Sequence, residues 1–288
     1  MTTPPDDIRV PRADLHTHST ASDGNLAPAD LVRQASERGL SLLALTDHDT
    51  TLGLDAAVRA GTALGVRVLR GIELSTDVDA GEIHILGYGI DPDSAELQTE
   101  IARLREASIS RIERMVVRLA ELGYPLPEGS VRPSEVGASI GRPHVARAMI
   151  AAGYVTSVGE AFDRFLGRGK PAYTKRERQR PAAAVALVRS AGGLPVLAHP
   201  LTVADLDTAL PVLIDAGLAG LEAYYGEYRD DQRRALAALA QEIGLLVTGG
   251  SDYHGEGFRA GRELGGVSIP SEVVERFLTA LGDRGTNS

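Results

Sequence analysis

The chain has 288 residues, of which 43% are hydrophobic, and this is enough to bury the core of one α/β barrel with a small insertion. It contains no cysteine, which excludes disulfides and thiolate metal ligands, so any bound metal must be held by nitrogen and oxygen. Its net charge of −9 argues against a broad, sequence-independent attraction to nucleic acid.

The beginning of the chain and its apolar stretches indicate where the protein works. Residues 1–10 contain two prolines and two aspartates but no basic segment followed by an apolar one, so we expect no secretory signal. Apolar stretches such as residues 40–45 are strand-sized and far below the roughly 20 residues that cross a bilayer. We therefore expect a cytoplasmic protein that binds no membrane, and nothing in the sequence indicates a protein partner.

Short β-rich apolar stretches alternate with helical patterns near the start of the chain, and the same alternation returns near its end. This order is typical of parallel βαβ units. The strands are expected at residues 13–19, 41–46, 66–74, 195–199, 220–224 and 245–249, and the helices at 28–38, 54–64, 182–191 and 230–243. Both halves therefore belong to one barrel-type sheet.

The middle of the chain has a different pattern. Residues 96–122 predict a long amphipathic helix, with apolar side chains on one face and arginines mostly on the other. Residues 143–151 predict a short helix with proline in its first turn. We therefore predict a mainly helical insertion domain at residues 93–180, within an α/β barrel domain formed by residues 8–92 and 181–288.

A basic segment, residues 164–180, ends this insertion with seven arginines and lysines. It is either a solvated loop or a collar for a phosphorylated substrate, in which Lys170 and Tyr173 would contact phosphate or base. Three tyrosines follow the predicted strand at 220–224. Among them, Tyr225 would either stack on a nucleobase or pack between the barrel and the insertion.

All seven histidines lie in short segments that are rich in polar residues. Because side chains at i and i+2 of a strand share one face, Asp14, His16 and His18 can point into the same volume. The other polar residues at predicted strand ends include His48, Glu73, Asp252 and His254. Parallel strands end at one mouth of a barrel, and imidazole and carboxylate suit zinc, iron and manganese. The sequence therefore predicts a multi-metal site at that mouth.

Eight motifs span nearly the whole chain: DLHTH at 14–18, SDG at 22–24, TDHD at 46–49, GIE at 71–73, HILG at 84–87, GRPH at 141–144, AHP at 198–200 and GSDYH at 250–254. They resemble the motifs of the polymerase-and-histidinol-phosphatase (PHP) superfamily. The closest similarity is to stand-alone bacterial phosphoesterases that act on nucleoside 3′,5′-bisphosphates and on the 5′ ends of short RNAs. The resemblance implies a distorted (β/α)7-type barrel and a metal-dependent phosphoric ester hydrolase.

The resemblance also implies three divalent metals per chain, which are manganese, iron or zinc. The first would be held by His16, His18, Glu73 and Asp252, the second by Asp23, His48 and His254, and the third by Glu73, His84 and His144, with Glu73 bridging. No ligand position of the family is empty in this sequence, which argues against an inactive member. We expect a hydroxide bridging the metals to attack phosphorus while the metals neutralise the equatorial oxygens.

Two further residues are candidates for catalysis and substrate binding. His199 is the one histidine outside the three ligand sets, and it would protonate the leaving oxygen, bind a phosphate oxygen or support a neighbour by hydrogen bonding. Arg142 precedes a predicted helix start, where a guanidinium and free N–H groups would bind phosphate. The expected substrate is a small phosphorylated nucleotide or a short 5′-phosphorylated RNA.

Three alternative functions stay open at this point. Histidinol-phosphate phosphatase would use the same metals on a smaller substrate, although the arginine-rich insertion favours more than one phosphate. An amidohydrolase also places an HxH pair on its first strand, but it typically bridges its metals with a modified lysine, and the two lysines here, Lys170 and Lys175, both lie in the basic segment. A non-catalytic metal-binding module would need nine polar ligands for structure alone, which is costly.

Overall fold

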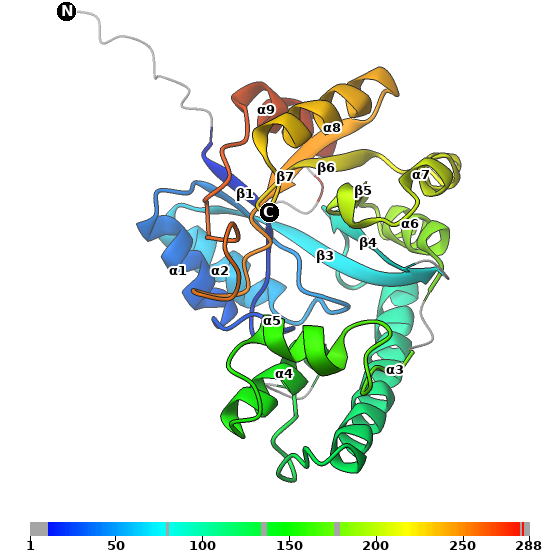
Figure 1. Cartoon of the computed structure of the whole chain (residues 1–288). Helices are drawn as coiled ribbons and strands as arrows, with labels where there is room; N and C mark the ends of the chain where they lie inside the picture. The colour runs from blue at the N-terminus through cyan, green and yellow to red at the C-terminus, as the bar shows by residue number, and fades with distance from the viewer. Residues whose placement is uncertain (1–10, 79–80, 134–136, 176–178, 283, 285–288) are drawn as a thin grey trace, which may run out of the picture.

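The computed structural model describes residues 11–78, 81–133, 137–175, 179–282 and 284, and its mixed α/β architecture is the one expected from the sequence (Figure 1). Within this part of the chain, seven strands follow one another in the order β1 to β7 around a nearly closed barrel. The ends of the sheet meet where the N–H of His18 donates to the carbonyl of Tyr253 at 2.9 Å and the N–H of Asp252 donates to that of His16 at 2.8 Å. The barrel thus closes at two of the predicted metal motifs.

The strands alternate with helices that lie outside the barrel. The strands are β1 (Ala13–Thr17), β2 (Leu42–Leu45), β3 (Arg67–Val78), β4 (Gly81–Tyr88), β5 (Leu194–Leu197), β6 (Gly220–Tyr225) and β7 (Leu246–Gly250). The helices are α1 (Pro28–Glu37), α2 (Leu54–Leu64), α3 (Ala95–Glu121), α4 (Arg142–Ala151), α5 (Val158–Ala161), α6 (Pro181–Ser190), α7 (Leu206–Asp215), α8 (Asp230–Glu242) and α9 (Ser271–Leu281). In Figure 1, α4, α5 and the far end of α3 form a lobe below the barrel. Across the described ranges, every helix is too short or too polar to span a membrane.

The helices form where apolar side chains recur at helical spacing. In α9, Val273, Val274, Phe277 and Leu281 are all buried, and they form one stripe along the helix. Among the described residues, the short helix α5 and the longer helices α7 and α9 were not predicted from the sequence, and α7 shows one reason. It contains Pro211, which interrupts the usual helical signal.

One strand departs from the parallel alternation that the sequence predicted. Only two residues separate β3 from β4, too few for a crossover helix, and β4 pairs antiparallel with both β3 and β5. In this register Glu73 lies opposite Leu86, and His84 lies opposite Ser75. The hairpin therefore brings His84 within one pleat of Glu73, from a strand that was not expected.

The helical segment has a hydrophobic cluster of its own, separate from the barrel core. It is built by Ile112, Met115 and Leu119 of α3 together with Ile140, Val145, Ala146, Met149, Val155, Ala161, Phe165, Leu166 and Ala172. The first half of α3 instead packs on the barrel through Leu97, Ile101 and Leu104. These clusters support the proposed insertion at 93–180. Residues 8–10, 176–178 and 285–288 of the two predicted domains lie outside the described residues.

Candidate metal centre

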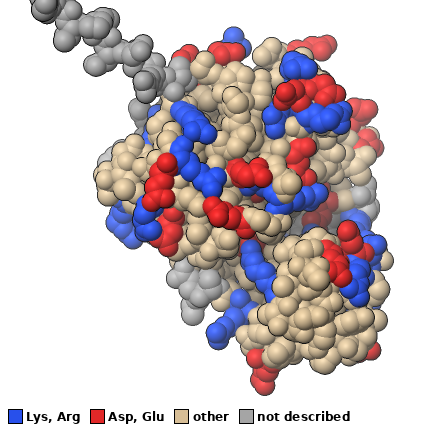
Figure 2. Space-filling model, turned by 60° about the vertical axis from the view of Figure 1, so that its left-hand side comes forward, with Lys and Arg blue, Asp and Glu red and all other residues tan. Residues whose placement is uncertain are grey.

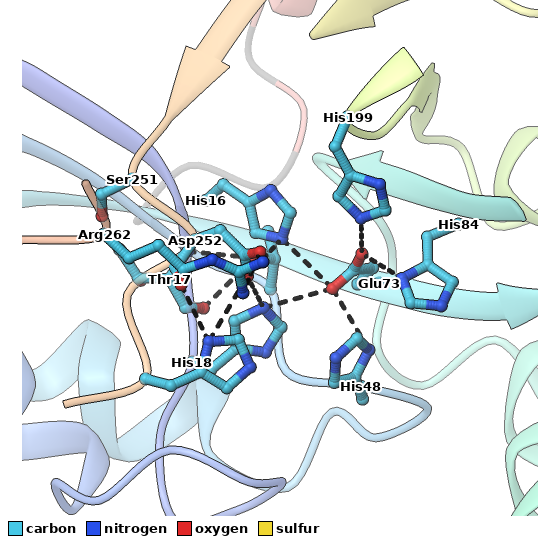
Figure 3. Close-up of polar contacts among 12 residues, drawn as sticks. His16, Thr17, His18, His48, Glu73, His84, His199, Ser251, Asp252 and Arg262 are labelled. Atoms are coloured by element: carbon cyan, nitrogen blue, oxygen red, sulfur yellow. Dashed lines mark hydrogen bonds and ion pairs between the residues drawn. The ribbon is translucent and has the colours of Figure 1, made fainter. Parts of the chain in front are cut away.

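Predicted ligands from five different strands or strand ends converge at one mouth of the barrel (Figure 3). They form three groups in which the ligand atoms all lie within 4.8 Å of one another. The groups are His16, His18, Glu73 and Asp252; His18, Asp23, His48 and His254; and His48, Glu73 and His84. Eight of the nine predicted ligands are thereby brought together, and the ninth, His144, belongs to none of the groups.

Glu73 lies at the centre of this arrangement and uses its two carboxylate oxygens in different directions. Oε2 faces His16 Nε2 at 3.1 Å, His18 Nε2 at 3.2 Å and His48 Nδ1 at 3.1 Å. Oε1 faces His84 Nδ1 at 2.8 Å and His199 Nε2 at 3.2 Å. A carboxylate with imidazoles on both oxygens has the geometry of a bridging ligand, as the sequence analysis anticipated for Glu73.

Several buried imidazole nitrogens have no hydrogen-bond partner. Both ring nitrogens of His18 and the Nε2 of His84 are in this state. The Nε2 of His18 lies 3.2 Å from Glu73 Oε2 and 3.2 Å from Asp252 Oδ1, yet it donates to neither. Buried polar atoms almost always have a hydrogen-bond partner. We therefore infer that these nitrogens bind a further group that lies between them and the carboxylates. A set of nitrogen and oxygen donors around a shared volume fits divalent cations.

Hydrogen bonds behind the ligands fix which nitrogen faces inward. His16 Nδ1 donates to Oε1 of the fully buried Glu222 at 2.8 Å, and His254 Nδ1 donates to the carbonyl of Asp252 at 2.8 Å. Each ring therefore keeps Nε2 as the unprotonated nitrogen on the inner side. The other oxygen of Glu222 accepts the backbone N–H of His199 at 2.8 Å, so one carboxylate orients two of the histidines.

His199 and His144 differ from what the resemblance implied. The hydroxyl of Thr202 donates to the carbonyl of His199, so His199 Nδ1 donates to that hydroxyl oxygen at 2.8 Å, and its Nε2 lies 3.2 Å from Glu73 Oε1. In contrast, His144 Nδ1 accepts the N–H of Gly141 at 3.1 Å. The structure thus places His199 beside Glu73 and His84, the position expected for His144.

The loops that carry these residues are tied down by two further carboxylates. Asp47 accepts hydrogen bonds from the N–H and hydroxyl of Ser19 and from the hydroxyl of Ser22, which holds the loop that presents Asp23. Asp14 accepts the N–H and the hydroxyl of Ser251 at 2.9 and 2.6 Å. Asp14 therefore joins β1 to the loop after β7, and it does not face the metal groups.

At the mouth of the barrel the backbone has strained conformations, and two strands approach each other unusually closely. Asp49, His199 and Asp252 have φ values of 50°, 32° and 56°, which side chains other than glycine rarely adopt. A Cβ at Gly250 would lie 2.4 Å from the backbone nitrogen of His16, so only glycine allows β7 to approach β1 this closely. These unfavourable conformations and close contacts lie at the mouth of the barrel, where the backbone determines the direction of the ligand side chains.

Neighbouring positive charges keep the carboxylates of Glu73, Asp23 and Asp252 ionised by lowering their pKa values. Burial raises the pKa of Glu73, but the neighbouring His48 and His16 outweigh it and hold this pKa well below its usual range. Burial lowers the pKa of His48 to about 4. Burial also opposes a charge on His18, yet the carboxylates of Asp252 and Glu73 raise its pKa to about 10. A metal that binds His18 must displace a proton, so its affinity will fall at low pH.

A cavity of about 650 Å³ opens over the metal groups, and the insertion forms its opposite wall. Arg142, at the first position of α4, lines it and donates to Glu82 Oε2 at 2.7 Å, with its guanidinium 5.0 Å from the ring centre of Phe162. Because Glu82 and His84 are two residues apart on β4, Arg142 is held next to the metal groups. Figure 2 shows basic side chains along the junction between the barrel and the lower lobe.

The other predicted substrate contacts have different surroundings. Lys170 is exposed and Tyr173 packs 5.4 Å from the guanidinium of Arg111, and neither lines the cavity. Tyr225 does line it, but its side chain is buried and its hydroxyl donates to Asp252 Oδ2 at 2.9 Å. Tyr225 therefore supports a predicted metal ligand and offers no open face for a nucleobase.

Three important residues escaped the sequence analysis. Glu222 is an acidic residue within an apolar strand, and this unexplained buried charge was a usable signal. Arg262 and Phe258 both line the cavity from the glycine-rich loop after β7. No periodic pattern marks them, and only the fold brings them to the site.

Comparison with known proteins agrees with this site. The model of the PHP domain matches residues 14–107. The chain is 35% identical to the 3′,5′-nucleoside bisphosphate phosphatase of Chromobacterium violaceum over 88% of this chain and 90% of that protein. It is 34% identical to the 5′-3′ exoribonuclease of Haemophilus influenzae over 84% and 89% of the two chains.

A solved structure is similar over almost the whole fold. It is that of a protein from Bifidobacterium adolescentis described as a metal-dependent phosphoesterase, which superposes with a TM-score of 0.87 at 33% identity and covers 96% of both chains. The family predicted from the motifs is thereby confirmed, and with it the class of enzyme. The chain belongs to the PHP family of metal-dependent phosphoesterases.

Proposed function

We propose that the protein removes the 3′-phosphate from nucleoside 3′,5′-bisphosphates. The observation that carries this proposal is the cavity, which has the metal groups on its barrel wall and the Arg142 guanidinium on its helical wall. Its volume of about 650 Å³ suits a nucleotide-sized ligand. The similarity to a phosphatase of that specificity supports the same substrate. The absence of cysteine is compatible with action in the cytoplasm.

Three divalent ions, of manganese, iron or zinc, would be held by this site. Their ligands are His16, His18, Glu73 and Asp252 for the first; Asp23, His48 and His254 for the second; and Glu73, His84 and His199 for the third. When bound, such ions make water a nucleophile at neutral pH and offset the charge on the phosphoryl oxygens. The inclusion of His199 is supported by its Nε2, which is 3.2 Å from Glu73 Oε1.

The remaining residues bind and orient the substrate. Arg142 would pair with the 5′-phosphate and exchange part of its contact with Glu82 for it, because guanidinium and phosphate form charge-assisted hydrogen bonds. His144 follows Arg142 in the cavity wall and would narrow the space around the sugar. Phe258 also lines the cavity, and its ring stacks on His254 with 4.7 Å between centres. Its other face is the natural place for the nucleobase.

A second substrate is favoured by one observation. An exoribonuclease acting in the 5′-3′ direction is nearly as similar to this chain as the phosphatase is. A short RNA with a 5′-phosphate would present the same two elements, a phosphate for Arg142 and a neighbouring phosphoester for the metals. The proposed enzyme would then release a nucleotide in place of inorganic phosphate.

The amidohydrolase alternative receives no support from the lysines. Lys170 and Lys175 are both exposed and neither lines the cavity, whereas Glu73 lies between the groups that a carbamate would bridge. Histidinol phosphate, with a single phosphate, would leave Arg142 without a partner in the substrate. The non-catalytic alternative conflicts with an open cavity over the ligands.

The proposal is tested by product release from three substrates side by side with manganese added. We expect inorganic phosphate from adenosine 3′,5′-bisphosphate at the highest kcat/KM, with the 5′-monophosphate as the other product. Nucleotide release from 5′-phosphorylated short RNA would identify the second substrate. Faster turnover of histidinol phosphate than of either nucleotide would overturn the proposal. A sample treated with chelator serves as the control, and it should lose activity and regain it with metal.

A further inference from the structure

Arg262 lines the cavity beside the metal groups and makes two short ion pairs there. Its NH1 lies 2.6 Å from Oδ2 of Asp252 (Figure 3). Its Nε lies 2.6 Å from Oε1 of Glu227. Its side chain is only 14% exposed, and that of Asp252 is 5% exposed. In such a dry environment a charge-assisted pair is strong and directional.

The two oxygens of Asp252 have separate tasks. Oδ2 accepts from both Arg262 and the hydroxyl of Tyr225, at 2.6 and 2.9 Å. Oδ1 points the other way, at 3.4 Å from His16 Nε2 and 3.2 Å from His18 Nε2. Two donors on one oxygen fix the rotation of the carboxylate, so the other oxygen is held among the imidazoles.

The backbone adds a reason why this rotation must be held. Asp252 has a φ of 56°, an unfavourable conformation that persists only where its surroundings enforce it. Glu227 anchors Arg262 from behind, and the guanidinium also lies 5.5 Å from the ring centre of Tyr225. Arg262 is therefore held in place by Glu227 and Tyr225. A guanidinium held in this way restricts the orientation of the Asp252 carboxylate.

We propose that Arg262 is a positioning residue that aims Asp252 Oδ1 at the first metal. This inference rests on the proposed function, because it takes Asp252 as a metal ligand. A planar guanidinium spans Asp252 and Glu227 at once, through two different nitrogens. A lysine has a single charged nitrogen and cannot hold both carboxylates in these positions. The role is thus specific to arginine, and charge alone does not provide it.

The test measures metal affinity directly and does not depend on turnover. Chelator-treated wild-type protein and variants are titrated with Co²⁺, followed by visible absorption, and with Mn²⁺, followed by calorimetry. For Arg262→Gln we expect affinity for the first metal bound through Asp252 to fall about 10- to 100-fold, the usual loss when a partner behind a ligand is removed. Arg262→Lys should recover only part of it, and Tyr225→Phe should lose less than Arg262→Gln.

The same loop offers a matched control. Arg259 also pairs with Glu227, at 3.0 Å from Oε2, but its side chain is 61% exposed and it makes no contact with Asp252 in the described structure. Arg259→Gln should therefore bind metal as the wild type does. Thermal melting of all variants without metal shows whether each is folded. If Arg262→Gln is not folded, Arg262→Lys takes its place in the comparison with Arg259→Gln.

Each outcome has a defined meaning. Arg262→Gln with wild-type metal affinity and a raised KM would overturn the inference, because Arg262 would then contact the substrate instead. Lower affinity with KM for p-nitrophenyl phosphate unchanged at saturating metal would support it. If the wild type and Arg259→Gln bind no metal, the proposed function fails as well, and this result is distinct from a failure of Arg262 alone.

Discussion

The two walls of the cavity are built in different ways. On the barrel wall, most ligands are buried and several are oriented by a partner behind them, such as Glu222 behind His16 and Arg262 behind Asp252. On the helical wall, Arg142 is held by one carboxylate and one aromatic ring. We therefore expect the first wall to be the more rigid and the second to exchange its contacts when substrate binds.

We interpret this difference as a division of tasks, in which the barrel wall holds the metals and the helical wall contacts the substrate. Ligands of several metals must keep their geometry within a fraction of an ångström, and strand ends on a shared sheet provide this. The helical wall belongs to a unit with its own hydrophobic cluster, so its side chains can change while the metal geometry stays the same. Relatives with the same barrel can therefore differ in substrate.

The largest effect is expected when the bridging position on the barrel wall is removed. Glu73→Ala deprives two metal groups of a ligand, so phosphate release should fall by at least about 1,000-fold and bound metal should decrease. Metal content is measured by elemental analysis and turnover by phosphate release. Glu82→Ala is the control, because Glu82 contacts Arg142 and no metal group, and it should keep its metal. Normal turnover in Glu73→Ala would refute the rigid-wall interpretation.

A comparison of His199→Asn with His144→Asn tests which of these two histidines binds metal. His199→Asn should lose metal together with kcat, because its Nε2 faces Glu73. His144→Asn should keep its metal and lose less activity, because its Nδ1 is engaged by the N–H of Gly141. Elemental analysis of both variants decides the assignment. Metal loss in His144→Asn alone would restore the ligand set that the family resemblance implied.

The sequence predicted the metal wall well because its signals are local. An HxH pair on a strand, and acids at the ends of apolar stretches, point to one mouth as soon as the barrel is assumed. The proposed exchange of His199 for His144 could not be foreseen, because the argument for it depends on the antiparallel β4 and on the contacts of each ring. These are properties of three-dimensional contacts, and no spacing records them.

The helical wall was harder to predict for a physical reason. Basic residues are usually solvated, so the segment at 164–180 gave no sign of which cations face the cavity. Lys170 and Tyr173 point elsewhere, whereas Arg142 is directed inward by Glu82, from a strand that the sequence did not reveal. For Tyr225 the sequence left two roles open, and in the structure it lines the cavity while its hydroxyl donates to Asp252.

A smaller effect is expected on the helical wall. Arg142→Ala removes one charged partner for the second phosphate, so KM for adenosine 3′,5′-bisphosphate should rise about 10-fold. Hydrolysis of p-nitrophenyl phosphate, which has a single phosphate, should change little, and metal content should not change. Steady-state kinetics on both substrates measure this difference. Equal effects on the two would remove Arg142 from substrate discrimination.

The smallest effect concerns the nucleobase, and it tests whether recognition extends beyond the phosphates. Phe162 is occupied by the guanidinium of Arg142 and Tyr225 is buried, so Phe258 is the aromatic side chain of the cavity with a face to offer. Phe258→Leu keeps an apolar cover over His254 but removes the aromatic face. Because stacking on a base contributes about 1–3 kcal/mol, KM for the nucleotide should rise by at least about 5-fold. Ribose 3,5-bisphosphate, which has both phosphates and no base, should be hydrolysed as by the wild type. If kcat/KM falls equally for both substrates, Phe258 acts by covering His254 and does not contact the base. The loop that carries Phe258 would then belong to the barrel wall with the metal ligands.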